Sequence, residues 1–206
     1  MWGMEAFLST PGHRGIVVPV QRQKPRSMES FVYTLLQSPV GPLFLAASER
    51  GLVALEFDAR MAGQQTVRPN PRDLRTENKF RFEESDDAIR PYASELEEYF
   101  AGERHQFDFP LDLRGTEFQL ACWRALLAIP YGETRTYADV ARAVGRPQAF
   151  RAVGIANNRN PVAIVVPCHR VIASDGTLCG YGGGIENKQN LLDLERAHPG
   201  VANLRF

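Results

Sequence analysis

The stretch NPVAIVVPCHRV, residues 160–171, sets the organisation of the C-terminal half of this chain. The apolar run 162–166 predicts a buried β-like segment that ends at Pro167, so a thiol follows directly after it. A nucleophilic cysteine must be a thiolate, and a nearby base or cation lowers its pKa from about 8.5. Adjacent residues of an extended strand face opposite sides, so His169 reaches Cys168 only if the backbone turns or a water bridges them. The alternative is an inert core thiol beside a satisfied histidine.

The other cysteines carry weaker signals. Cys122 occupies an apolar helical position beside Trp123, which predicts a core residue. Cys179 lies in a glycine-rich loop, residues 179–184, which lacks the spacing of a phosphate-binding fingerprint. Three cysteines form no CxxC pair, and an odd count indicates free thiols in a reducing compartment. With scattered histidines and no such pair, we expect no metal site.

Three helices are predicted upstream of residue 160. Thr116 to Gln119 has the form of a capping box that opens an amphipathic helix. The segment from Thr136 to Gly145 predicts a second helix, and a third runs from Pro147 to about Asn158. The last two are joined by a tight turn, which makes a helix-turn-helix candidate. Many helical hairpins never contact DNA, so this signal alone is weak.

The third helix has an unusual composition. Its small residues allow another surface to approach closely, and a helix seldom carries a glycine without a reason, because Gly costs about 1 kcal/mol relative to Ala. Either DNA or the first domain could be that surface. Phe150 and Val153 are expected to face the core, opposite a face that contains Gln148, Arg151, Ile155 and Asn158. Between Asp139 and Asp175 no acidic residue occurs, which suggests a surface that meets an anion.

The N-terminal half has a different pattern. The short runs 31–37, 42–47 and 51–57, separated by turn residues, predict a meander of antiparallel strands. Residues 61–85 are polar and predict a loop. Residues 86–101 have helical spacing, and a short strand near 105–109 is expected to close this domain. We therefore divide the chain into an extension (1–28), an N-terminal α/β domain (29–112) and a C-terminal domain (113–206).

The amino-acid composition limits the structural class of this protein. The chain has 206 residues, 44% hydrophobic and 23% charged, with 24 basic and 24 acidic side chains. These values are ordinary for a globular protein and exclude collagen-like, coiled-coil and wholly disordered chains. The apolar runs are far shorter than the roughly 20 residues of a membrane span, and no secretory signal is visible. We expect no membrane partner and a cytoplasmic location, or a nuclear one if the source is eukaryotic.

Several motifs in order resemble the O6-alkylguanine-DNA alkyltransferases, also called methylated-DNA–protein-cysteine methyltransferases. The resemblance covers roughly Thr116 to Glu195 and rests on four blocks besides residues 160–162. They are PCHRV at 167–171, YGE at 131–133 with Tyr137, RAVG at 151–154, and GYGGG at 180–184 ahead of Lys188 and LLDLE at 191–195. Such a set is highly specific. It implies an α+β fold with a small antiparallel sheet and helix, ribonuclease H-like in the family, followed by a winged helix-turn-helix-like domain.

The resemblance also implies a reaction. The family moves an alkyl group from O6 of guanine in DNA irreversibly to a cysteine, which would be Cys168, in a single turnover without a cofactor. O4-alkylthymine is left open as a further substrate. His169 would act as base through a water, Glu195 would orient it, and Asn160 would support the turn. Tyr137 would help to rotate the nucleotide and give a proton to the departing guanine.

Contacts to DNA and to the base follow from the same resemblance. The implied partner is double-stranded DNA bound through its minor groove by a monomer. Arg151 would fill the gap left by the flipped base, and the other DNA-binding residues would be Tyr137, Arg146, Gln148 and Ala152. The base pocket would include Tyr181, Val171 and Gly182. Gly182 stands where the family often has Ser or Ala, and the cysteines of the N-terminal zinc site found in some members are missing.

Two other functions compete with this interpretation. One is a non-enzymatic lesion binder that recruits repair factors, which stoichiometric alkyl transfer would exclude. The other is a cysteine hydrolase using Cys168, His169 and Glu195, which would turn over on an ester or amide. Nothing in the sequence singles out the oxyanion hole that a hydrolase needs.

Overall fold

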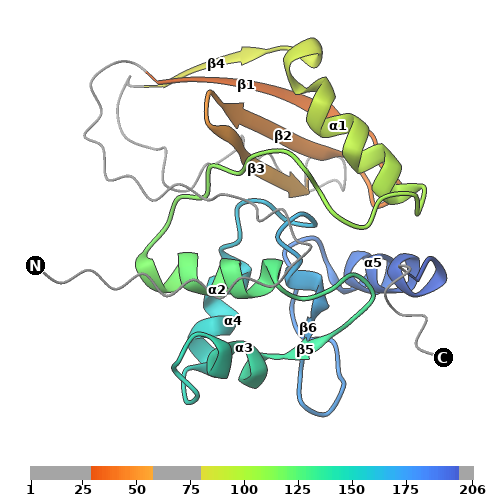
Figure 1. The fold of residues 1–206 in the computed structure, drawn as a ribbon. Coiled ribbons are helices and arrows are strands. Elements are labelled where there is room, and N and C mark those ends of the chain that lie inside the picture. The colour runs from red at the N-terminus through yellow and green to blue at the C-terminus, as the bar shows by residue number, and fades with distance from the viewer. Residues whose placement is uncertain (1–28, 58–79, 200–206) are drawn as a thin grey trace, which may run out of the picture.

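Three antiparallel strands begin the N-terminal half of the computed structural model, which describes residues 29–57 and 80–199 (Figure 1). They are β1 (Glu29–Leu36), β2 (Leu43–Ser48) and β3 (Gly51–Phe57). Val32 to Leu36 pairs with Leu43 to Ala47 across the first turn, and β2 pairs with β3 across the second. The predicted meander is therefore confirmed. The extension 1–28 lies outside the described residues.

A fourth strand corrects the prediction of a loop over residues 61–85. Residues 80–84 form β4 (Phe80–Glu84), which pairs in parallel with β1 and gives the strand order β3-β2-β1-β4. Residues 61–79 lie outside the described part of the chain. The alternating sequence of β4 carries exposed charges, which suits a strand at the edge of a sheet. That polarity made the segment look like a loop.

Helix α1 (Asp86–Phe100) confirms the predicted helix and covers one face of the sheet (Figure 1). The Ser85 side chain caps it, and its buried face consists of Ile89, Ala93, Leu96 and Tyr99. The predicted strand at 105–109 is wrong. Its aromatic residues pack in the core without a ladder, and the pairing to the sheet is made instead by an isolated bridge from Leu111 to Leu52.

Residues 113–199, the described part of the C-terminal half, form four helices of more than one turn. α2 (Glu117–Leu127) begins at the predicted capping box. α3 (Tyr137–Ala143) begins at the predicted helix start, Thr136, where the structure shows a second capping box. α4 (Phe150–Asn158) begins three residues after Pro147, which lies in the preceding turn. α5 (Ile185–Ala197) ends the described fold. The short strand β5 (Arg135–Thr136) precedes α3.

The apolar run 162–166 is buried but is not the predicted strand. It forms a tight turn in which Ile164 has φ = +71°, a left-handed conformation that costs a β-branched residue energy. The backbone then enters the one-turn helix η2 (Cys168–Arg170), followed by the strand β6 (Val171–Ile172), which pairs in parallel with β5. The fold class, α+β with a sheet-and-helix half and a helical half, is confirmed.

The sheet of the first half holds this turn directly. The amide of Leu55 in β3 donates to the Pro161 carbonyl at 2.8 Å, and the Ala163 amide donates back to Leu55 at 2.9 Å. Figure 1 shows the sheet layer stacked over the helical layer, with β3 next to the segment between α4 and η2. The N-terminal half therefore helps to position the cysteine loop.

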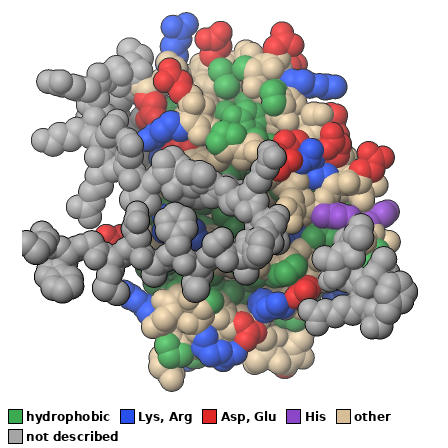
Figure 2. Space-filling model, in the orientation of Figure 1, with side chains coloured by type: hydrophobic (Ala, Val, Ile, Leu, Met, Phe, Trp, Pro, Cys, Tyr) green, Lys and Arg blue, Asp and Glu red, His purple; other side chains and the backbone are tan. Residues whose placement is uncertain are grey.

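Charge is distributed unevenly over the surface. In Figure 2 acidic side chains gather over the upper part of the molecule, where the sheet and α1 lie. Among the described residues no helix is both long and apolar enough to cross a bilayer.

Candidate active site

Cys168 begins the one-turn helix η2, and only 7% of its surface is exposed. The Asn160 side-chain amide donates to its Sγ at 3.2 Å and to the Val166 carbonyl at 2.7 Å, which ties the thiol to the turn. Burial raises the pKa of the Cys168 thiol, and the Asn160 bond only partly opposes this. The resting cysteine is therefore a neutral thiol that needs a base to become a nucleophile.

His169 supplies a base within the same helical turn. Its Nε2 lies 2.8 Å from Glu195 Oε1 on α5, and both side chains are fully buried. Burial lowers the pKa of His169, although Glu195 opposes the shift, so the imidazole is neutral near pH 7. With Nε2 engaged as a donor, Nδ1 is the acceptor; it is buried and contacts no hydrogen-bonding group in residues 29–57 or 80–199. The backbone turns at η2, but no hydrogen bond joins the imidazole to the Cys168 thiol among the described residues.

Glu195 accepts hydrogen bonds from four residues, which we call the carboxylate cage: Tyr99, Gly132, His169 and Arg170. The Arg170 guanidinium donates to both oxygens at 2.9 Å, and the Gly132 amide donates to Oε2 at 2.9 Å. The Tyr99 hydroxyl donates to Oε1 at 2.8 Å. Burial opposes ionisation, but the bonds from His169 and Arg170 hold the pKa of Glu195 well below its usual range. A fixed negative charge therefore lies beside the imidazole.

Glu195 lies beside His169 as the resemblance implied, but the contacts of the other three cage residues, Gly132, Arg170 and Tyr99, were not predicted. Arg170 was included in the acid-free window that suggested an anion-binding surface, yet it is buried and its guanidinium is occupied by Glu195 and the Ile129 carbonyl. It is therefore unavailable to phosphate. Tyr99 gave no local signal, because it belongs to α1 and lies 96 residues from its acceptor.

A buried lysine braces the segment after η2. Lys188 on α5 donates to the Val171 carbonyl at 2.6 Å, and only 1% of its surface is exposed. Burial lowers the pKa of Lys188. The sequence included Lys188 in a matched block without assigning it this contact.

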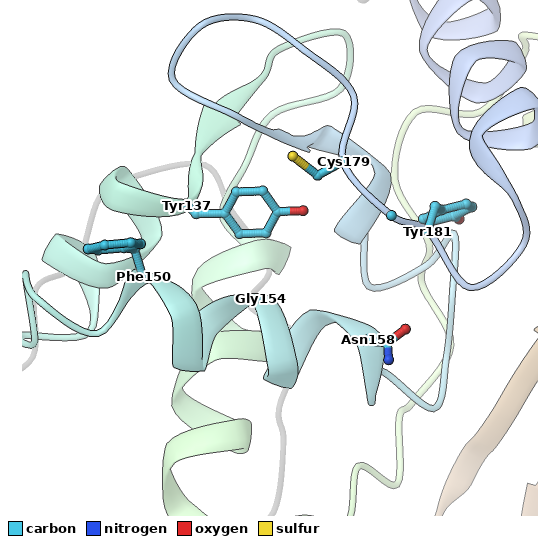
Figure 3. A pocket seen from close by; sticks show the side chains of 7 residues that line it. Tyr137, Phe150, Gly154, Asn158, Cys179 and Tyr181 are labelled. Carbon is cyan, nitrogen blue, oxygen red and sulfur yellow. The ribbon is translucent and has the colours of Figure 1, made fainter.

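A cavity of about 510 Å³ lies beside α4 (Figure 3). It is lined by Tyr137, Phe150, Gly154, Asn158, Cys179, Gly180 and Tyr181. Burial raises the pKa of Tyr137 and Tyr181, and the nearby Cys168 thiol adds to both shifts. Both tyrosines of the cavity lining therefore lie near Cys168, which is not itself a lining residue. Phe150, which was expected in the core, is exposed at the cavity. Cys179 also lines the cavity, although the sequence assigned a pocket role only to Tyr181 and Gly182 of its loop.

The remaining predicted residues lie on α4, in the turn before it, and in and near the cavity loop. Val153 is buried in the core as expected, while Arg146, Gln148, Arg151 and Ala152 are exposed. Of the three predicted pocket residues, Tyr181 lines the cavity, whereas Val171 is fully buried and Gly182 is exposed and directly follows the lining residue Tyr181. The roles of these residues stay predictions.

Gly183 controls how the cavity loop packs. A Cβ atom at this position would lie 2.5 Å from the ring of Phe57, which packs edge-to-face on Tyr181 with ring centroids 5.6 Å apart. Gly183→Ala should therefore cost about 1–3 kcal/mol by overpacking. We expect a lower melting temperature by calorimetry. Gly182→Ala is the matched control, because nothing lies within 4 Å of its Cβ position; an equal loss of stability in both variants would contradict the contact.

Comparisons with known proteins agree with this geometry. Residues 117–197 match the family described as "6-O-methylguanine DNA methyltransferase, DNA binding domain", and residues 31–113 match its "ribonuclease-like domain". A methylated-DNA–protein-cysteine methyltransferase of Methanosarcina barkeri is 48% identical over 79% of this chain and 96% of its own length. One of Mycolicibacterium paratuberculosis is 51% identical over 81% of this chain and 93% of its own.

Solved structures show the same likeness. The crystal structure of the Mycobacterium tuberculosis O6-methylguanine methyltransferase matches with a TM-score of 0.70 and 44% identity, over 83% of this chain and 96% of that one. A complex of the same organism's enzyme with DNA matches with a TM-score of 0.67 and 41% identity, over 84% and 96%. Sequence and structure together show that the chain belongs to the 6-O-methylguanine DNA methyltransferase family.

Proposed function

We propose that this protein repairs DNA by transferring the alkyl group of O6-alkylguanine to Sγ of Cys168. The observation that carries the proposal is the arrangement around Cys168. A nearly buried thiol, held by Asn160, is followed in the chain by a neutral histidine that pairs with a caged carboxylate. The nearby Tyr137 and Tyr181 line a cavity large enough for a base. The relatives named as methylated-DNA–protein-cysteine methyltransferases and the relative solved with DNA support the same activity and partner.

Activation begins with loss of the thiol proton. His169 Nδ1 takes that proton through a bridging water, while Glu195 holds the ring by Nε2 and stabilises the imidazolium that forms. The thiolate then attacks the alkyl carbon. A carbon–sulfur bond forms as the carbon–O6 bond breaks, and its electron pair stays on guanine. The thioether is not hydrolysed, so each chain acts once.

The departing guanine needs a proton. We assign this proton to Tyr137, whose raised pKa keeps the hydroxyl protonated beside the cavity. Tyr137 recovers a proton from the His169 imidazolium through solvent, so the thiol proton ends on guanine overall. Tyr181 forms a wall of the base pocket. Val171 and Gly182 are assigned to the same pocket on the family resemblance, and Gly182 follows Tyr181 directly in the chain.

The target base must leave the duplex before this chemistry, since in-line attack is blocked in the stack and extrusion costs a few kcal/mol. We propose that α4 enters the minor groove, about 6 Å wide, with Arg151 filling the gap left by the base. The small exposed residue Ala152 permits close approach. The exposed side chains of Arg146 and Gln148 contact the sugar-phosphate backbone of the DNA. Such contacts position the protein without reading the base sequence.

The domain division 29–112 and 113–206 is part of this proposal, with the extension 1–28 preceding it. The two family matches, which meet between residues 113 and 117, support the boundary. We infer a monomer that acts without a cofactor, because every group in the scheme comes from one chain.

Intact-protein mass spectrometry tests the transfer. After incubation with duplex DNA carrying one O6-methylguanine, we expect a gain of about 14 Da at the Cys168 peptide, saturating at one methyl group per chain. A folded, reduced chain that binds the lesion without gaining mass would be a recruiting module. Repeated turnover on an ester without any gain from DNA would indicate a hydrolase.

Arg151→Ala should slow repair of duplex DNA by roughly 10- to 100-fold, because about 1.4–2.8 kcal/mol of the flipping cost is no longer offset. Repair of the free base O6-benzylguanine needs no extrusion, so its rate should stay within about twofold. Single-turnover rates on both substrates make the comparison. Equal slowing on both would remove the proposed role of Arg151.

A further inference from the structure

Tyr99 is the one member of the carboxylate cage that comes from the N-terminal half. It lies in the last turn of α1, within the residues that match the ribonuclease-like domain, whereas Glu195 lies on α5. The phenol and the carboxylate are both fully buried, and Oη donates to Oε1 at 2.8 Å. A hydrogen bond to a charged acceptor in such surroundings is short and strong.

The oxygen that Tyr99 binds is the one that binds His169. Glu195 Oε1 accepts from Tyr99 Oη and from His169 Nε2, each at 2.8 Å. Donors on one oxygen share its negative charge, so a phenol there weakens the attraction between that oxygen and an imidazolium. Burial and the nearby Glu195 raise the pKa of Tyr99 well above its usual value, so the phenol remains a donor at every relevant pH.

We propose that Tyr99 is a positioning residue that sets the basicity of His169 through Glu195, so that the N-terminal half of the chain controls the pH range in which Cys168 is activated. This inference rests on the proposed function. It differs from that proposal because it assigns part of the reaction's tuning to a domain that contributes no reacting atom.

Other charged and titratable groups face Glu195 and His169, and they must stay unchanged in any test of Tyr99. The guanidinium of Arg170 contributes the largest neighbouring positive charge, since it binds both oxygens of Glu195. The groups that face Glu195 and His169 from the surrounding elements are Tyr99 on α1, Tyr131 before β5, Cys168 and Arg170 on η2, Tyr181 in the cavity loop and Lys188 on α5. Changing only the Tyr99 hydroxyl leaves all the others in place.

The Tyr99 ring also has a packing role that must be separated from the hydroxyl. Its ring packs on Phe100, Phe107 and Tyr131. Tyr99→Phe keeps that ring and removes only the donor. Tyr92→Phe is the matched control: Tyr92 lies on the same helix, is partly buried, and packs on Phe109 away from the cage.

The first readout is the single-turnover rate of methyl transfer against pH, with the full chain and O6-methylguanine duplex. Without the phenol, Oε1 attracts the imidazolium more strongly, so His169 becomes protonated at higher pH and stops acting as a base. Tyr99→Phe should move the acid limb of the pH–rate profile to higher pH. Transfer should then be about three- to tenfold slower at pH 6, while the rate at pH 8.5 stays within about twofold. Tyr92→Phe should leave the limb in place.

A second variant reverses the sign and protects against a folding defect. The 3-fluorotyrosine side chain, placed at residue 99 alone, keeps the ring and makes the phenol a stronger donor. The acid limb should then move to lower pH. An unmoved limb in both Tyr99 variants, a shift of the same sign in both, or an equal shift in Tyr92→Phe would overturn the proposal.

An NMR titration of labelled histidine separates this proposal from the proposed function. The His169 pKa should rise in Tyr99→Phe and fall with 3-fluorotyrosine, relative to the unchanged chain, and neither shift requires DNA or methyl transfer. A chain that never methylates itself yet shows these shifts would contradict the repair function alone. A chain that methylates itself normally without them would contradict the role of Tyr99 alone.

Discussion

Cys168→Ala should abolish methyl transfer while lesion binding stays within about threefold of the unchanged chain. The loss is complete because catalysis here is covalent and no second thiol combines the same surroundings. Cys122 is buried within α2, where burial raises its pKa. Cys179 is exposed at the cavity, but it lacks the amide and the histidine that flank Cys168. Intact-mass and peptide analysis after incubation with methylated duplex measures the loss.

Cys122→Ala is the control for this prediction, since it removes a thiol from the core without touching the cavity. Its transfer rate should be unchanged, with at most a modest loss of stability from the small void that remains. A methyl group found on Cys179 in the Cys168→Ala chain would contradict the assignment of the acceptor. Loss of lesion binding in that chain would show that the thiol also supports the fold of the site.

Glu195→Gln should be the most destabilising conservative change in the C-terminal half. It leaves Arg170 buried without its counter-charge and turns one acceptor of the carboxylate cage into a donor. Removing one partner of a buried ion pair costs about 3–5 kcal/mol. For a chain of this length that lowers the melting temperature by about 6–20 °C. Calorimetry measures the shift, and transfer should slow as His169 loses its orienting partner.

Asp193→Asn is the matched control on the same helix. Its carboxylate is 56% exposed and pairs with Arg196, so the change should move stability by less than about 0.5 kcal/mol. Similar melting temperatures for Glu195→Gln and Asp193→Asn would show that the carboxylate cage contributes no stability.

The same carboxylate predicts how stability depends on pH. Its folded pKa is depressed, so its stabilisation is fully present above its ordinary value of 4.5 and is lost as pH falls toward the folded value. Burial also depresses the pKa of His169. As the pH falls, the unfolded chain therefore takes up a proton on this histidine before the folded chain does, which favours unfolding. Both effects destabilise the protein in acid. Glu195→Gln should flatten the dependence below about pH 4.5, and a parallel curve for the variant would contradict the charge assignment.

Local patterns in the sequence were sufficient for most elements. The capping boxes at Thr116 and Thr136 fixed the starts of α2 and α3, because these hydrogen bonds are made within four residues. The alternation of apolar residues and turns defined the meander. β4 was missed because a charged edge strand looks like a loop until its partner strand is known. The run 162–166 was misread as a strand, because a short apolar run does not reveal its backbone conformation.

The sequence by itself identified the thiol, the histidine and the carboxylate of the proposed reaction, through motifs that keep their order and spacing along the chain. Only the tertiary structure decided what surrounds them. In the folded chain Arg170 is buried and binds Glu195, and the Tyr99 hydroxyl of α1 donates to the same carboxylate. Cys179 and Phe150 line the cavity. The physical reason is that hydrogen bonding and burial depend on groups far apart in the chain. A sequence motif indicates which chemistry a residue can perform, but the packing of the folded chain decides which groups hydrogen-bond to it.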